Sequence, residues 1–172
     1  MTTAIRLARV LSTAGLLALL LPGAAVAAPP EHAPAETVPF TLPGGDFCAH
    51  DVTLSNPAFK AKDTFYGPLP DGTVRIRSRG MTASQATDET TGASIFRRGG
   101  SSITYAFAAD GSLVATATGL FFAWYLPGDD SDLGPGLWLV NGRAREVYDS
   151  EGNFVSATFT GTAIDVCEAL EG

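Results

Sequence analysis

His50 and Asp51 are the first residues to weigh for chemistry, because a histidine and a carboxylate together can form a general acid–base pair. Adjacent residues of a strand point to opposite faces, so these two side chains can cooperate only across a bend. The sequence contains no Gly-x-Ser-x-Gly turn that would present a nucleophile. We therefore expect His50 to be structural or exposed, and the sequence predicts no catalytic residue and no cofactor.

Three carboxylates, Asp129, Asp130 and Asp132, lie in a stretch rich in glycine and proline. Calcium prefers oxygen ligands, so a weak calcium site at these residues is one reading. The spacing is not that of an EF-hand loop, and no glutamate or asparagine stands where a bidentate ligand would complete it. A solvated acidic loop is the competing interpretation.

Arginines at positions 75, 77, 143 and 145 would form an anion site if the outward faces of their strands align. The competing interpretation is that outward charges keep strands soluble. The chain carries a formal net charge of -7. A negative body repels nucleic acid unless basic residues are concentrated, so nucleic acid is not an expected partner.

Residues 119–141 hold both tryptophans and form two apolar blocks around a loop of glycine, proline and aspartate. These blocks predict two central strands of a hairpin. Trp124, Tyr125, Trp138 and Tyr105 are the candidates for contact with a small hydrophobic ligand or a protein partner. The loop, residues 126–136, is the expected meeting point because binding residues gather on loops carried by rigid scaffolds.

Short runs that alternate apolar and polar residues must position these groups. Val74 and Ile76 alternate with arginines, and residues 103–107, 113–117 and 155–159 repeat the pattern. Turn signals such as Asp71-Gly72 and Asp110-Gly111 separate the runs. We predict an all-β domain, an up-and-down antiparallel meander of eight or nine strands closed as a small barrel, with a short C-terminal helix.

The apolar phases of these strands predict a core. Its expected members are Val74, Ile76, Ile103, Tyr105, Phe107, Phe122, Trp124, Leu137, Leu139 and Phe159. Within the two fully apolar blocks, alternation cannot distinguish one face from the other.

The N-terminus indicates export. Arg6 and Arg9 precede an apolar run too short to span a bilayer, and Ala25-Val26-Ala27 offers a cleavage site, so residues 1–27 are predicted to be a signal peptide. Residues 28–39 contain four prolines and are predicted to be a flexible linker. Residues 40–172 are predicted to form a single domain of a secreted, extracellular protein with no membrane-spanning segment.

Cys48 and Cys167 are the two cysteines of the chain. An exported protein meets an oxidising compartment, and two cysteines allow one connectivity, so we predict a disulfide between them.

Several local features resemble a family of small secreted actinobacterial proteins of unassigned function. The features are a Phe-Cys-Ala near the mature N-terminus, Thr90-Thr91-Gly92, Asp110-Gly111-Ser112, the Pro-Gly and Gly-Pro-Gly that flank the central loop, and a terminal Asp165-Val166-Cys167-Glu168-Ala169-Leu170. The resemblance covers nearly all of residues 47–170. It implies a secreted β-domain with one disulfide and carries over no catalytic residue.

The function expected from the sequence is non-catalytic binding of a small ligand or partner. Two alternatives stay open: a cofactor-free enzyme of the barrel cyclase or isomerase kind, and a purely structural secreted domain.

Overall fold

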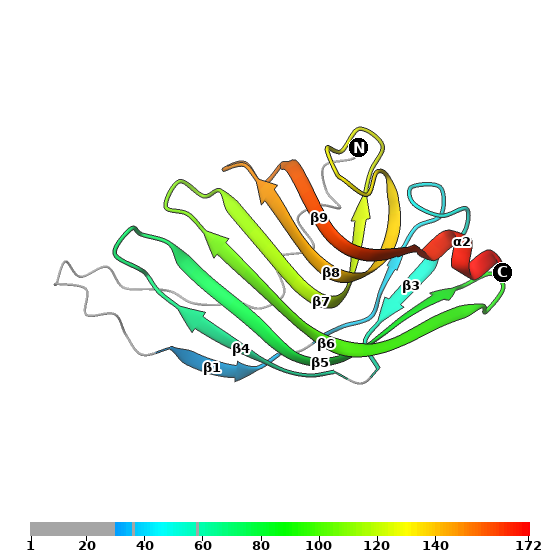
Figure 1. The fold of residues 1–172 in the computed structure, drawn as a ribbon, viewed down its shortest axis with the longest axis horizontal. Helices are drawn as coiled ribbons and strands as arrows, with labels where there is room; N and C mark the ends of the chain where they lie inside the picture. The colour runs from blue at the N-terminus through cyan, green and yellow to red at the C-terminus, as the bar shows by residue number, and fades with distance from the viewer. Residues whose placement is uncertain (1–29, 36, 58) are drawn as a thin grey trace.

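The computed structural model describes residues 30–35, 37–57 and 59–172. The predicted signal peptide lies outside the described residues, as do the first two positions of the predicted linker. The described chain forms a nine-stranded antiparallel sheet and a short C-terminal helix, as the sequence predicts (Figure 1).

The strands pair almost entirely in chain order. They are β1 (Glu31–Pro34), β2 (Phe40–Leu42), β3 (Val52–Ser55), β4 (Lys60–Tyr66), β5 (Val74–Asp88), β6 (Ser94–Phe107), β7 (Leu113–Tyr125), β8 (Gly136–Tyr148) and β9 (Phe154–Asp165), and the helix is α2 (Val166–Glu171). Strands β4 to β9 form a continuous meander. β3 and β4 pair with opposite halves of β5, and β2 and β1 pair with β3 and β4 in turn.

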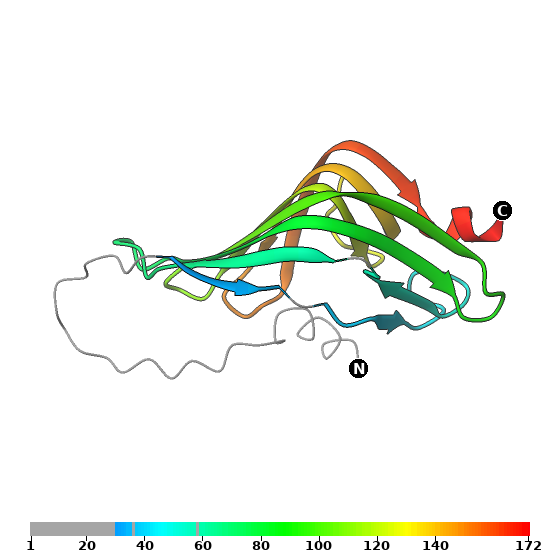
Figure 2. The same cartoon turned by 90° about the horizontal axis from the view of Figure 1, so that it is seen from below.

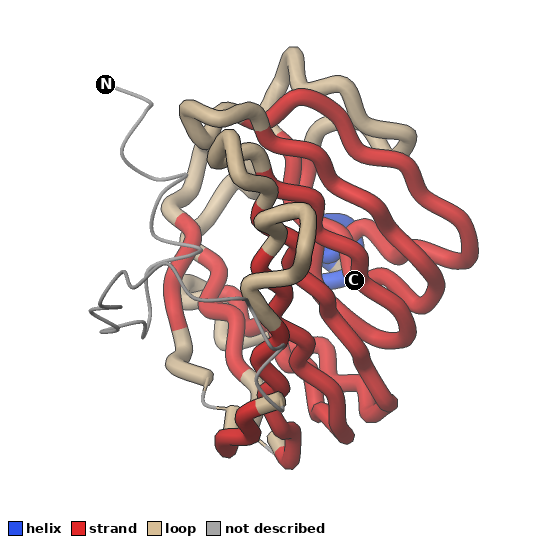
Figure 3. The backbone as a smooth tube through the Cα atoms, turned by 90° about the vertical axis from the view of Figure 1, so that its left-hand side faces the viewer, coloured by secondary structure: helices blue, strands red, loops and turns tan. Residues whose placement is uncertain are grey.

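The sheet is open, so the predicted closure into a barrel is not observed. Its main path runs from β1 at one edge to β9 at the other, and no pairing joins these two strands in the described part of the chain. Figure 3 shows the long strands side by side in a curved sheet. Both edges of the sheet are protected against pairing with another chain. β1 is short and carries Pro34, and β9 is covered by the loop that follows β7.

Part of the predicted linker belongs to the sheet. Glu31–Pro34 forms β1, which pairs with β4 from Glu31 opposite Phe65 to Pro34 opposite Lys62. Proline lacks a backbone N–H and is excluded from the interior of a sheet, but an edge strand tolerates it because one side needs no partner for its backbone N–H groups. The flexible-linker prediction is therefore corrected for these residues.

A row of glycines crosses the sheet near the middle of its long strands. Gly80 of β5, Gly119 of β7, Gly142 of β8 and Gly161 of β9 lie on one line of paired residues, with Ser101 of β6 between the first two. A Cβ atom at Gly119 would collide with the carbonyl oxygen of Gly100, and one at Gly142 with that of Thr160. Figures 1 and 2 show the long strands bending through their middle. We attribute the bend to this glycine row, which lets neighbouring backbones approach closely.

The bend creates two cores. Pairing between β6 and β7 ends at Ser101 and Gly119, while β7 stays paired with β8 up to Tyr125. The first core joins separate parts of the sheet to the helix and contains Leu42, Val52, Leu54, Ala86, Leu120, Leu137, Leu139, Val166 and Leu170. The second contains Phe121, Ala123, Tyr125, Val140, Ala144 and Ala157. Beyond the glycine row, β7 and β8 thus contribute side chains from one face to the first core and from the other face to the second.

The core prediction is confirmed for some residues and wrong for others. Leu137 and Leu139 are buried, but Val74 is 40% exposed. Phe122 and Trp124 are only partly buried, whereas their neighbours Phe121 and Tyr125 are buried in the second core. Two buried faces explain why these strands show no apolar–polar alternation.

The predicted disulfide is present. Cys48 and Cys167 are bonded, with Cα atoms 5.3 Å apart. Cys167 lies in α2, whose first turn is capped by the Asp165 carboxylate accepting the Glu168 amide at 3.1 Å. The bond therefore joins the two ends of the domain beside the first core, where Phe47 and both cysteines pack.

Aspartates close the turns at one end of the sheet. Asp71 lies between β4 and β5, Asp110 between β6 and β7, and Asp149 between β8 and β9. Hydrogen bonds lower the pKa of each carboxyl group because they stabilise its charged form. Asp71 accepts from the Thr73 backbone and Asp110 from the Ser112 backbone. Asp149 accepts from the side chain and the backbone of Asn153.

We expect these turns to make the protein less stable in acid. A carboxyl group whose folded pKa lies below its ordinary value of 3.8 stabilises the fold fully above that value and stops doing so as the pH falls through the folded pKa. The melting temperature of the protein should therefore decrease when the pH is lowered below about 4. Asp149→Asn keeps an acceptor oxygen but does not titrate, so its melting temperature should fall less over the same interval. Equal acid sensitivity of the two proteins would contradict this assignment.

Candidate anion-binding surface

The structure separates the predicted aromatic site residues. Trp124 packs at the first core, with its ring centroid 5.3 Å from that of Phe40. Tyr125 is buried in the second core, and Trp138 packs against that core. Tyr105 lies on β6, paired with Ile76 and Ala115. These side chains therefore line no common site.

The predicted binding loop is attached to the edge of the sheet. Ala157 of β9 donates its backbone N–H to the Asp130 carbonyl at 2.7 Å, and its carbonyl accepts the Asp132 amide at 3.2 Å. The Asp132 carboxylate accepts the Phe159 amide at 2.8 Å. Leu133 packs on the second core. The loop thus acts as a short extra strand that covers β9.

The three loop carboxylates do not gather around a common point. Asp129 accepts the backbone amide of Leu126 at 2.8 Å, while Asp132 is directed to Phe159. In the described part of the chain, no cluster of three or more histidine, cysteine or acidic residues is placed to hold a metal ion. Asp129 and Asp132 therefore have structural roles within the loop and at the edge of the sheet.

His50 and Asp51 do not form an acid–base pair. Asp51 accepts the Gly44 amide at 2.7 Å and so closes the turn before Cys48. His50 is exposed beside Asp88, at an indentation of about 10 Å³ that also touches Cys48 and Cys167. That volume is about the size of one water molecule. Burial raises the pKa of Asp88, but hydrogen bonds from the Thr90 and Thr91 amides outweigh it and the pKa is lowered.

Sequence reasoning missed a polar group in the second core. Glu146 accepts hydrogen bonds from the hydroxyls of Tyr125 at 3.1 Å and Tyr148 at 2.8 Å. Phe154 packs on both tyrosine rings, with centroids 5.7 Å away in each case. The partners come from β7, β8 and β9, so only the strand register reveals the cluster. It fixes the packing of Tyr125 and Tyr148 at one end of the second core.

Strand register also brings most basic residues to one face of the sheet. Side chains of directly paired residues share a face. One row of paired residues is His32, Thr64, Arg77, Thr104, Thr116, Arg145 and Thr158. The next row is Pro34, Lys62, Arg79, Ser102, Thr118, Arg143 and Thr160. Arg75 follows on β5, paired with Tyr66 and Ala106.

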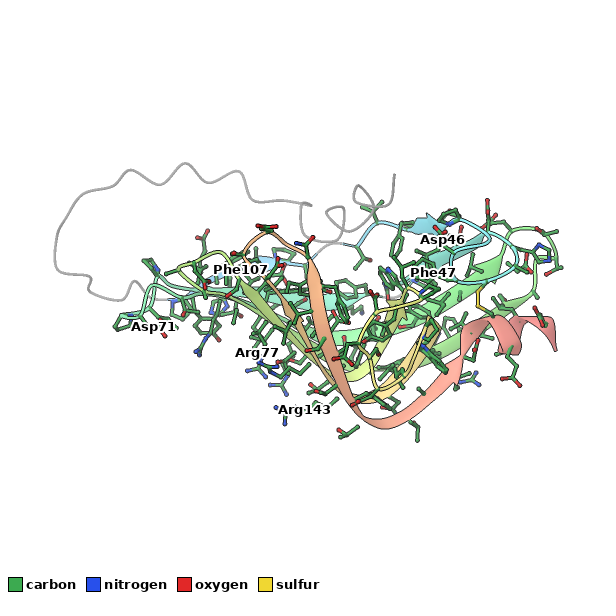
Figure 4. All side chains as sticks on the ribbon, turned by 90° about the horizontal axis from the view of Figure 1, so that it is seen from above. Asp46, Phe47, Asp71, Arg77, Phe107 and Arg143 are labelled. Atoms are coloured by element: carbon green, nitrogen blue, oxygen red, sulfur yellow. A yellow bond between two sulfur atoms is a disulfide. The ribbon has the colours of Figure 1, made fainter. Side chains whose placement is uncertain are left out.

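We use the term arginine surface for the basic and hydroxyl residues at the centre of these rows. Its members are Lys62, Arg75, Arg77, Arg79, Arg143 and Arg145, with Ser102, Thr104, Thr116 and Thr118 between them. All of its basic residues are exposed. Arg77 and Arg143 project from the same side of the sheet, and Phe107 projects from the opposite side (Figure 4).

The arginine surface contains no carboxylate. In the two rows, no described strand position carries aspartate or glutamate, although acidic residues outnumber basic ones 18 to 11 in the chain. Asp71, in the turn before β5, interacts electrostatically with Arg75 at the end of one column. Asp63 and Glu146, which do lie in these strands, belong to rows on the other face. The sheet therefore concentrates positive charge on one side of an acidic protein.

The basic residues form two columns. Residues two apart along a strand are about 7 Å apart, which sets the spacing within Arg75, Arg77 and Arg79 on β5 and between Arg143 and Arg145 on β8. Three strand spacings, about 14 Å, separate the columns. Arg77 Nε donates to Ser102 Oγ at 3.2 Å, so this guanidinium leans over the hydroxyl strip between the columns.

Comparison of the chain with protein-family models, curated proteins and solved structures finds no match. The resemblance to the secreted actinobacterial family therefore stays a prediction.

Proposed function

We propose that this protein is an exported, non-catalytic binding domain whose arginine surface takes an anionic ligand. The observation that carries the proposal is the register of β4 to β8, which places arginines from two distant strands on one exposed face without a carboxylate. Guanidinium groups offer several fixed donors that match carboxylate, sulfate and phosphate oxygens. A face of this kind binds anions and carries no group that would transform them.

One further observation supports export. The disulfide between Cys48 and Cys167 is compatible with an oxidising compartment. Among the described residues, no helix is long and apolar enough to cross a membrane. The hydrophobic-ligand proposal loses support because Tyr125 is buried and the loop is bonded to β9.

The competing interpretation is that outward arginines only keep the sheet soluble. Binding of the protein to dextran sulfate, with uncharged dextran as the ligand control, distinguishes the two. We expect the combined change Arg75→Gln, Arg77→Gln, Arg143→Gln and Arg145→Gln to weaken binding at least about tenfold at about 0.1 M salt, since each lost charge pair at a surface contributes up to about 1 kcal/mol.

The matched control is Arg97→Gln with Arg98→Gln, which removes charge from exposed positions of β6 beyond the glycine row. Affinity for dextran sulfate should change less than about twofold, because screening confines the attraction to nearby charges. Because the control removes two charges and the first variant four, equal losses of binding free energy per charge removed would show a non-specific charge effect and overturn the proposal. Unchanged binding in the first variant would overturn it as well.

A further inference from the structure

We propose that the anionic ligand is an acidic polysaccharide chain, which lies along the strands on the hydroxyl strip between the two arginine columns. This inference rests on the proposed function and adds the chemical class and the direction of the ligand. The strip consists of Ser102 and Thr104 on β6 and Thr116 and Thr118 on β7, and arginines flank it on β5 and β8.

The hydroxyl strip points to a ligand with hydroxyl groups of its own. Serine and threonine hydroxyls both donate and accept hydrogen bonds, whereas sulfate, phosphate and carboxylate groups only accept. A sugar unit offers donors and acceptors together with its acidic group. The arginines would pair with the acid groups and the strip would bond the sugar hydroxyls.

The same surface is a poor match for single-stranded nucleic acid. Binding of single strands relies on aromatic side chains on which bases stack. In the two rows of the arginine surface, no described position carries an aromatic residue other than His32 at the edge, and Tyr66 lies outside the columns, beside Arg75.

The arrangement of the columns sets the direction of the chain. Arginines recur along β5 and along β8 at about 7 Å, whereas the distance across the strip is about 14 Å. A linear chain that follows the strands meets guanidinium groups on both sides at each step. A chain that crosses the strands meets one arginine at each column and only hydroxyls between them.

The test compares oligogalacturonate, an acidic sugar chain, with polyphosphate, which carries charge but no hydroxyl groups. The variant Thr104→Val with Thr116→Val removes two facing hydroxyls of the strip while keeping shape and strand preference. Thr158→Val with Thr160→Val is the control, because these residues lie on β9 outside the columns. Melting temperatures check that both variants fold.

We expect the strip variant to bind oligogalacturonate about tenfold more weakly, from loss of two hydrogen bonds, with polyphosphate binding unchanged. The β9 control should match the wild type for both ligands. Affinity for oligogalacturonate should also rise with chain length and level off once the strip is filled. Equal binding of oligogalacturonate to wild type and strip variant would overturn the polysaccharide inference, as would binding independent of chain length.

The experiments distinguish failure of the polysaccharide inference from failure of the proposed anion-binding function. If the strip variant has no effect but the arginine variant still loses binding to dextran sulfate, the surface is an anion site and the ligand is not recognised by its hydroxyls. If the arginine variant also keeps its affinity, both the inference and the proposed function fail.

Discussion

Replacing Gly119 by alanine is expected to lower the free energy of unfolding by about 4 kcal/mol or more, or to prevent folding altogether. Two causes act at this position. Gly119 has φ +88, a conformation that costs a residue with a side chain about 1–2 kcal/mol. A Cβ atom there would also collide with the Gly100 carbonyl oxygen, in a sheet whose bend depends on that close approach. Denaturant unfolding measures the change.

Gly128→Ala separates these two causes. Gly128 has φ +90, almost the same backbone conformation, but no atom lies within 4 Å of where its Cβ would be. We expect this variant to lose only about 1–2 kcal/mol. If Gly119→Ala is no more destabilising than Gly128→Ala, the glycine row does not hold the bend by close approach of the strands.

Removing the disulfide is expected to lower the free energy of unfolding by about 2–5 kcal/mol. The bond joins residues 119 apart in sequence, so its loss frees a long loop in the unfolded chain. It also releases α2, whose Val166 and Leu170 are buried in the first core. The variant should carry both Cys48→Ala and Cys167→Ala, so that no free thiol is left to react, and its denaturant midpoint should be compared with that of the wild type.

Reductant provides the control for this prediction. Adding dithiothreitol should lower the midpoint of the wild type toward that of the double variant and leave the double variant unchanged. Equal stability of oxidised wild type and double variant would mean that α2 and the first core hold the chain ends together without the bond.

Local patterns predicted the antiparallel meander from β5 to β9 and the disulfide. Alternation around Val74 and Ile76, with turns at Asp71-Gly72 and Asp110-Gly111, indicates antiparallel neighbours, because both signals act within a few residues. A single possible pairing of cysteines made the disulfide predictable. These features need no knowledge of long-range register.

The pairing of residues far apart in the chain could not be predicted from the sequence. Gly80, Gly119, Gly142 and Gly161 are far apart in the chain and become a row only through pairing. Beyond this row, the two faces of β7 and β8 pack in different cores, so alternation could not distinguish Phe121 from Phe122. The edge strand β1 escaped prediction because the four prolines of residues 28–39, one of them in β1 itself, indicated a linker.

The sequence predicted an anion site at the arginines only on the condition that the outward faces of their strands align. Alternation placed Arg75 and Arg77 on one face of a strand, and the same holds for Arg143 and Arg145. Whether these two pairs face the same side depends on the register across β6 and β7, which the sequence does not reveal. The prediction of an aromatic binding site was unreliable because the large side chains of Trp124, Tyr125 and Trp138 suit a core as well as a binding site.

The most direct test of the anion-binding surface is an NMR titration that follows the side-chain Nε–Hε signals of the arginines as short dextran sulfate is added. The account predicts that signals of Arg75, Arg77, Arg79, Arg143 and Arg145 shift together with one saturation curve, while those of Arg97 and Arg98 stay in place. Shifts confined to Arg97 and Arg98, or equal small shifts at every arginine, would contradict it.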